Sequence, residues 1–543
     1  MKEPCAPPKL VDAFGVFAFD LNLGQICEYV YPHNVFTRED MKAISMLSFP
    51  DSQSATRSGI SDCVYTFSYR IRGTDSSATD SAVRLGLDRA TGLLQCYVYF
   101  RQVEDPTNSR GYYQKSFVLI SSSSRAFSNS NDLLTLVRRV GNKFYLAEET
   151  GCGREVLVDS YYHIQEIGFT RHKSSSSSDL GTGLSSLSVR SLELSDSPSS
   201  PSQSGAVVDV LFTLLPGLWH LWESLLVGLP VLVYCAGDAS LCSRLVLSVP
   251  SLIAPLEWTG DLRPLLSIFD SDYAVFKANT SGLPPCVVGI TSPMALSQLA
   301  TSFSLLVVIG EGEVDSQKFV QVASSASGRM YVAESVTSVS SGTRTRVSSL
   351  AYRFSLSQAG YRLALPADES SVTKKLVTSS ESINRSLILR HFALLTKELL
   401  MAFLEFVETD SSCIQSDIFA PTPSVKFFSP GQFLAALSVG VGKHLSVLSR
   451  DKLVALYTAF TQTHTFRLWL AESQLHAFRE SIIAHAQLVA TRVTGDVVMW
   501  LSVNDRRRGR LCIERLVKEL GSSYPVLVAQ LKAVLLMLGG EEQ

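Results

Sequence analysis

The sequence predicts an α/β protein built from several modules, and three observations carry that prediction. The chain has 543 residues, enough for about three or four domains. Its middle part alternates short apolar runs with helical patterns, which is typical of an α/β layer. Its last third repeats apolar residues at three- and four-residue spacing, which indicates helices.

The stretch GLPVLVYCAGDASLCSRLV, residues 228–246, is open to three interpretations. It could belong to a membrane span, it could hold a metal or redox pair at Cys235 and Cys242, or it could be a buried strand followed by a helix. A span needs about 20 apolar residues, and charged residues and prolines interrupt this one. No second Cys or His pair lies nearby, so a metal site is not favoured. The run 229–235 therefore predicts a strand, with Asp238 as the N-cap of the next helix.

Residues 10–170 predict an upstream mixed module. Two short strands flank a turn at Gly24, and a capped helix begins at Thr37. The segment CVYTFSYRIRG alternates as a strand does, and a hairpin with the loop EDPTNSRG follows it. A helix from NSNDLLTL is expected to end at Gly141.

Four further regions follow. Residues 171–205 are serine-rich and predict a linker, in which Ser-Pro pairs at Ser197 and Ser200 are candidate phosphorylation sites. Residues 206–335 predict the central α/β module, with later strands in LLSIFD, CVVGI and SLLVVIG. A second polar stretch covers 335–350, and residues 370–543 predict a helical module.

Composition and motifs exclude several classes of function. The net charge of −2 does not call for a nucleic-acid partner. The 10 cysteines contain no C-x-x-C pair, and neither a phosphate loop nor a catalytic triad signature is present. We therefore predict no catalytic residue, no cofactor and no metal, and a protein that acts on another protein. With no signal peptide or membrane span expected, the predicted location is cytoplasmic.

Two clusters of charged residues each have two possible roles. The stretch TGDLRPLLSIFDSDY places Asp261, Arg263, Asp270 and Asp272 close together. Paired carboxylates can do acid–base work, but turns and loops also collect them. The basic run RRRGR, residues 506–510, is expected in a solvated turn between helices, with contact to anionic lipid or an acidic partner as the alternative.

Several longer segments resemble one known family. They include FAFDLNLGQICEYVYP, YVYFRQVEDPTNSRGYYQKSFVLIS, PPCVVGITSP, LRHFALLT and LYTAFTQTHTFRLWL, together with the stretch from LLVGLPVLVYC to LRPLLSIFDSDY. In their residues and in their order along the chain, they resemble the DENN-domain family, and within it subfamily six. That resemblance implies three modules: upstream longin-like, central α/β and downstream helical. The serine-rich insert and the polar stretch near residue 340 depart from the family pattern.

The resemblance also implies a function. DENN proteins are guanine-nucleotide exchange factors for Rab GTPases, so the implied partner is a Rab, of the Rab-fourteen type on recycling endosomes, and membrane association is expected to be peripheral. The Rab is expected in a groove between the upstream and central modules. We take as candidate Rab-binding residues Pro50, Asp51, Ser52, Trp258, Asp261 and Arg263.

Two rival functions are weighed against exchange. Some proteins of this architecture insert an arginine to activate GTP hydrolysis, and Arg70, Arg72 and Arg110 lie on the module that would carry it. The other rival is a scaffold that binds a Rab without promoting exchange. In none of these cases does the protein have a chemical active site of its own.

Overall fold

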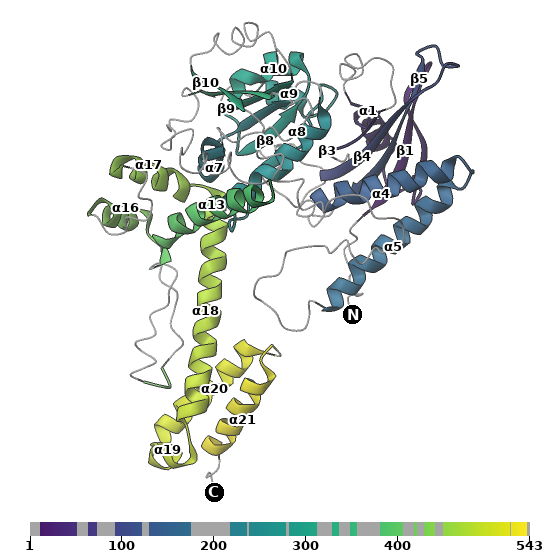
Figure 1. The fold of residues 1–543 in the computed structure, drawn as a ribbon. Coiled ribbons are helices and arrows are strands. Elements are labelled where there is room, and N and C mark those ends of the chain that lie inside the picture. Colours follow the sequence, from purple (N-terminus) through teal and green to yellow (C-terminus); the bar gives the residue numbers. More distant parts are fainter. Residues whose placement is uncertain are drawn as a thin grey trace. The chain divides into compact units, whose positions relative to one another are not determined.

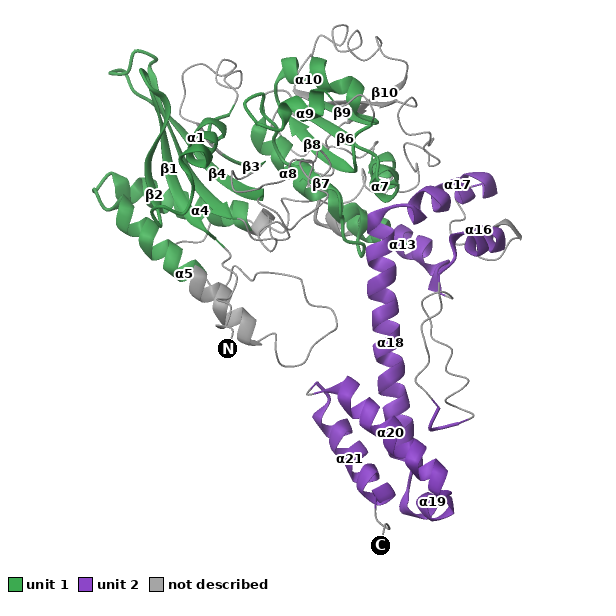
Figure 2. Ribbon diagram, turned by 180° about the vertical axis from the view of Figure 1, so that it is seen from behind, with its two compact units in different colours: residues 1–394 green, residues 395–543 purple. Residues whose placement is uncertain are grey.

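The computed structural model divides the chain into two compact units, residues 1–394 and 395–543 (Figures 1 and 2). The structure describes residues 11–50, 63–72, 93–121, 130–174, 218–235, 238–278, 282–311, 328–335, 348–355, 381–404, 417–420, 428–439, 449–521 and 523–539.

Unit 1 begins with an antiparallel sheet in the order β2-β1-β5-β4-β3. Its strands are β1 (Ala13–Asp20), β2 (Gly24–Tyr31), β3 (Cys63–Arg72), β4 (Leu93–Glu104) and β5 (Tyr112–Ser121). The predicted turn at Gly24, the third strand and the hairpin β4–β5 are all confirmed. Helix α1 (Arg38–Leu47) also begins as predicted, because Thr37 and Asp40 form a reciprocal capping box.

Two helices, α4 (Ser130–Glu148) and α5 (Gly153–Ser174), cover one face of this sheet. The prediction that α4 ends at Gly141 was wrong. A Cβ added at Gly141 would lie 2.6 Å from the ring of Tyr99, so the glycine allows close packing of α4 on β4 rather than ending the helix. Helix α5 was not predicted, and the serine-rich linker after Ser174 lies outside the described residues.

The second sheet of unit 1 has the order β10-β11-β9-β6-β8-β7. Its strands are β6 (Val231–Cys235), β7 (Asp261–Arg263), β8 (Cys286–Ile290), β9 (Leu305–Glu311), β10 (Gly328–Ser335) and β11 (Ser348–Ser355). The neighbours β9, β6, β8 and β7 are parallel, and β11 and β10 extend the sheet antiparallel. The two antiparallel strands were not predicted.

Helices lie on both faces of the parallel strands, as the α/β prediction requires. They are α7 (Leu218–Leu226), α8 (Ala239–Ser248), α9 (Tyr273–Ala278) and α10 (Pro293–Leu299). Helices α9 and α10 pack with β6, β8 and β9 in one apolar core. The prediction of a strand at LLSIFD was wrong: the strand is β7, which begins four residues earlier, and residues 264–272 form the loop that leads to α9.

The stretch 228–246 is a buried strand followed by a helix, as predicted. All five residues of β6 are buried, and the carboxylate of Asp238 accepts the amide hydrogen of Leu241 at 2.8 Å. Cys235 and Cys242 are free, buried thiols, and burial raises the pKa of Cys235 well above its ordinary value. Helix α8 packs against β3 of the first sheet as well as β6, β7 and β8 of the second. It therefore joins the two sheets within unit 1.

Unit 2 is helical in the part that the structure describes. It contains the end of α13 (Glu381–Met401), then α16 (Pro430–Val439), α17 (Arg450–Thr461), α18 (His464–Arg492), α19 (Gly495–Trp500), α20 (Val503–Leu520) and α21 (Pro525–Gly539). Helices α20 and α21 pack against α18 (Figure 1). The prediction of a turn at the basic run 506–510 was wrong, because these residues lie within α20. None of the helices described is both long and apolar enough to cross a bilayer.

The glycine at position 141 gives the first test of the fold. Replacing it in Gly141→Ala favours the helix locally by about 1 kcal/mol, but the new methyl group would overlap the Tyr99 ring. We expect a net loss of about 1–3 kcal/mol in the free energy of unfolding, measured by denaturant titration. Gly431→Ala in α16, where a Cβ would meet no atom within 4 Å, is the control and should cost nothing. Equal stability of both variants would contradict the packing role.

Candidate functional site

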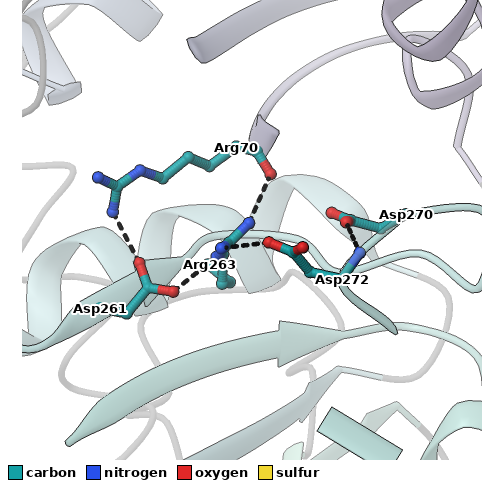
Figure 3. A network of polar contacts seen from close by, with 5 residues as sticks. All are labelled: Arg70, Asp261, Arg263, Asp270 and Asp272. Carbon is teal, nitrogen blue, oxygen red and sulfur yellow. Dashed lines mark hydrogen bonds and ion pairs between the residues drawn. The ribbon is translucent and has the colours of Figure 1, made fainter. Parts of the chain in front are cut away.

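A buried network of charged side chains joins the two sheets of unit 1 (Figure 3). Arg70, at the end of β3, donates from Nη1 to Oδ1 of Asp261 at 2.8 Å. The other oxygen of Asp261 accepts from Nε of Arg263 at 2.7 Å, and Nη2 of Arg263 donates to Asp272 at 2.8 Å. Asp270 accepts the amide hydrogen of Asp272 at 2.8 Å. All five side chains are at least nine-tenths buried.

The network connects residues that are far apart in the sequence. Asp261 lies 191 positions beyond Arg70, and Nη1 of Arg263 also donates to the carbonyl oxygen of Arg70 at 3.3 Å. A buried ion is tolerated only when a partner and hydrogen bonds replace its hydration. The carboxylate of Asp261 meets that condition by binding one arginine from each sheet.

Charge in the network is nearly balanced, with two guanidinium groups against three carboxylates. Burial alone would lower the pKa of Arg263, but Asp261, Asp270 and Asp272 together raise it above the ordinary value, so Arg263 is always charged. Burial raises the pKa of Asp270 to about 6, and the charge of Arg263 only partly opposes this. Burial therefore favours the protonated form of Asp270 over the charged form.

The network fixes the loop 264–272 that follows β7. Asp272 caps α9 by accepting from the amides of Val275 and Phe276 through its carbonyl oxygen, and the amide of Leu266 donates to the carbonyl oxygen of Gly289 at 2.7 Å. A Cβ at Gly289 would lie 2.4 Å from the carbonyl oxygen of Pro264. The missing side chain therefore lets this loop lie directly against β8.

Of the residues predicted to bind a Rab, the three in the central module are buried. Trp258, Asp261 and Arg263 are exposed by 3%, 1% and 0%. A Cβ added at Gly260 would lie 2.3 Å from the indole ring of Trp258, so the ring packs directly against this glycine. In the described structure Asp261 and Arg263 connect to the loop after β7 through Asp272, and all three side chains present almost no surface of their own.

The three candidates after α1 are only partly described. Pro50 is half-buried, while Asp51 and Ser52 lie outside the described residues. The end of α1 that precedes them is held firmly, because Tyr69 donates to the carbonyl oxygen of Ile44 at 3.0 Å and Ser116 donates to that of Ser48 at 2.6 Å.

The arginines considered for a GTPase-activating role have different environments. Arg70 is buried in the network, so it is not available to enter another protein. The side chain of Arg72 lies outside the described residues. Arg110 is exposed in the β4–β5 loop, and its guanidinium stacks on the ring of Phe19 at 4.1 Å. Only Arg110 is therefore described in a position that a partner could reach.

Two exposed apolar residues follow the carboxyl ends of β7 and β8 in the second sheet, and neither was predicted as a site residue. Strands β7 and β8 are parallel neighbours, so the loops that follow them leave the same edge of the sheet. Phe269 in the first loop is 57% exposed, and Met294 at the start of α10 is 51% exposed. The signal in the sequence was available but weak: each is a large apolar residue within a polar turn, in LSIFDSD and TSPMA.

No protein-family model matches the chain. The chain is 24% identical to Protein DENND6 homolog of Dictyostelium discoideum over 89% of its own length and 73% of that protein. It is 24% identical to Protein DENND6A of Gallus gallus, covering 89% and 82%, and 26% identical to Protein DENND6B of Homo sapiens, covering 84% and 77%.

The chain is similar to DENND6 proteins along most of its length, and these matches support the DENN-domain family, subfamily six. The resemblance stated from the sequence is confirmed by these matches.

The central carboxylate of the network provides a direct test. Asp261→Asn leaves Arg70 and Arg263 buried without their shared negative charge, so we expect a loss of about 3–5 kcal/mol in the free energy of unfolding. The control is Asp417→Asn, which removes the carboxylate of an ion pair with Arg508 whose side chains are 42% and 51% exposed. It should cost no more than about 1 kcal/mol. Equal losses in urea titrations would show that the buried network does not hold the unit together.

The raised pKa of Asp270 predicts a pH dependence. Because its pKa in the folded protein is about 6, above the ordinary 3.8, the folded state binds this proton more tightly than the unfolded chain. The resulting stabilisation is complete below about pH 4 and is lost as the pH rises through about 6. Asp270→Asn removes the titration and keeps an oxygen for the amide of Asp272.

Relative to the wild type, Asp270→Asn should therefore gain roughly 1–3 kcal/mol between about pH 4 and pH 7.5. The measurement is the unfolding free energy of both proteins at several pH values. Parallel profiles for the two proteins would contradict the raised pKa.

Proposed function

We propose that this protein is a guanine-nucleotide exchange factor for a Rab-family small GTPase. The observation that carries the proposal is the similarity to DENND6 proteins over 84–90% of the chain. The part of the chain outside these matches is shorter than either unit, so the similarity extends into both units. The resemblance to the DENN family implies exchange activity, with a Rab of the fourteen type as the first partner to test and endosomal membranes as the place of action.

The mechanism that fits this proposal needs no catalytic acid or base. A Rab holds its nucleotide through a phosphate loop, Mg²⁺ and two switch segments. An exchange factor binds the form with displaced switches better than the nucleotide-bound form, and the difference in affinity limits the acceleration. A 10⁴-fold faster release requires about 5.5 kcal/mol, which an interface of about 1,600 Å² can supply when part of it forms only with moved switches.

The charged residues of unit 1 agree with a mechanism of this kind. Asp261, Arg263 and Asp272 are buried and paired with one another, so they are engaged in structure rather than in proton transfer. Among the described residues, no group of His, Cys, Asp and Glu is arranged to hold a metal ion. In this proposal the protein acts on its partner by binding it.

We place the contact with the Rab on the edge of the second sheet where β7 and β8 end. Phe269 and Met294 supply exposed apolar area there, and apolar side chains on rigid loops are typical anchors of an interface. Asp261 and Arg263 then act as positioning residues, because their ion pairs hold the loop that carries Phe269. Trp258 is buried beside Gly260, directly before β7. The prediction of direct contact by these three residues is thus replaced by an indirect role in this proposal.

The test of the function is release of fluorescent GDP from a panel of purified Rabs, with Mg²⁺ present. Acceleration with one or two Rabs would support exchange and identify the partner. Binding of a Rab without acceleration would favour the scaffold. Faster GTP hydrolysis that is lost in Arg110→Ala would favour GTPase activation.

The contact surface has its own prediction. Phe269→Ala and Met294→Ala should each lower the rate of GDP release by about tenfold, because each removes exposed apolar contact area. The melting temperature should stay unchanged, since both side chains are more than half exposed. Leu146→Ala, at a leucine of α4 that is 68% exposed, is the matched control and should retain full activity. Full exchange by both variants would place the interface elsewhere.

A further inference from the structure

The junction between α19 and α20 exposes an unusual amount of apolar surface. Six of the seven residues from Val497 to Val503 are apolar. Val498 is buried and Leu501 packs against the core of unit 2. Three others project outward: Met499 is 74% exposed, Trp500 is 89% exposed and Val503 is 83% exposed. We name these three residues the α19–α20 corner.

The corner is a fixed part of the fold and not a frayed end. Val493 and Val498, on its inner side, belong to the apolar core that α18, α20 and α21 form together. Ser502 caps α20 by accepting the amide hydrogen of Asp505 at 3.1 Å, and its hydroxyl donates to the carboxylate of the same residue at 2.6 Å. The three apolar side chains are therefore displayed from a rigid turn.

Basic side chains follow directly on α20. Arg507 is one helical turn beyond Val503, so both lie on the same side of the helix. Arg508 pairs with Asp417 and Asp505, and Arg510 donates to the carbonyl oxygen of Leu538. Arg507 is exposed and forms no hydrogen bond or ion pair with any residue that the structure describes. Its charge is therefore available to a partner.

The exposed side of α20 continues this mixture of charge and apolar area. Leu511 is 62% exposed, and Arg515 and Lys518 are exposed on the following turns. Acidic side chains are present as well, at Asp496, Asp505, Glu514 and Glu519, but Asp505 is occupied by the cap and by Arg508. The sequence from Arg492 to Glu519 holds seven basic and four acidic residues, so the surface is basic in balance.

We propose that the α19–α20 corner docks on an anionic lipid surface. Tryptophan prefers the boundary between headgroups and acyl chains, where its apolar ring and its N–H are both satisfied. Arginines beside it attract anionic headgroups and keep the apolar side chains at a shallow depth.

A protein partner fits the corner less well. Binding sites for proteins concentrate their anchors in packed patches that a partner can enclose. Here the three side chains project singly from a turn, with exposures of 74% to 89%. A bilayer surface accepts such isolated, protruding side chains because lipids rearrange around each one. The proposal does not depend on exchange activity, since it concerns a different unit of the chain.

The experiment uses the full chain and large unilamellar vesicles. One set is phosphatidylcholine alone, and the other contains about a third phosphatidylserine. Co-sedimentation gives the bound fraction. Trp500 also reports directly: of the five tryptophans, Trp219, Trp222 and Trp258 are buried, Trp469 is half-buried, and Trp500 is exposed. Brominated lipids should therefore quench the emission of Trp500 when it enters the boundary.

We expect binding to the anionic vesicles and quenching that is lost in Trp500→Ala. The affinity for vesicles should fall about tenfold in the double variant Met499→Ala with Trp500→Ala. Arg507→Glu should weaken binding several-fold, and salt should weaken it further. The matched controls are Leu23→Ala, at a leucine that is 77% exposed in unit 1, and Arg139→Glu, at an exposed arginine of α4; both should bind as the wild type does.

Three results would overturn the proposal. These are failure of the wild type to bind anionic vesicles, equal binding to both vesicle types, and binding that survives the loss of Met499 and Trp500. Because the substituted side chains are exposed, folding should be unaffected, which circular dichroism and the melting temperature check. Exchange on a Rab in solution should be unchanged in these variants, so a failure here is distinct from a failure of the proposed exchange activity.

Discussion

The carboxylate of Asp261 is the constraint on which the arrangement of unit 1 depends. It lies on a strand of only three residues and accepts from an arginine of each sheet. Desolvation of a buried charge costs several kcal/mol unless a partner replaces the water, and this carboxylate is the partner that the two arginines share. The position of β7, the loop after it and the end of β3 are therefore set together. Helix α8, which packs against both sheets, supplies the apolar part of the same junction.

Elements with complete local signals could be predicted from the sequence. The strand β6 is buried along its whole length and is bounded by turn residues, and the side chain of Asp238 caps α8. Thr37 and Asp40 define the start of α1 in the same local way. In each case the residues that determine the structure are within a few positions of one another, so periodicity and capping rules are sufficient.

Features that depend on distant contacts could not be predicted. Gly141 resembles a helix end in the sequence, but its role is set by the ring of Tyr99 on strand β4. LLSIFD has the apolar content of a strand, yet the network holds it as a loop because Arg263 and Asp272 must meet. Candidate site residues show the same limit: Asp261 was predicted as a Rab contact from the family resemblance, and its ion pair with Arg70, 191 positions away in the sequence, is visible only in the structure.

Charged and apolar side chains of unit 1 have separate roles in the proposed exchange function. In unit 1 the ion pairs of Arg263 with Asp261 and Asp272 are buried and fix a loop. Phe269 on that loop is 57% exposed. A rigid loop loses little conformational entropy when it binds, so more of the contact energy is left to favour one state of the partner over another. Differential affinity is what an exchange factor requires. In the proposed exchange function, the buried ion pairs therefore fix the loop, and Phe269 on that loop supplies the contact area.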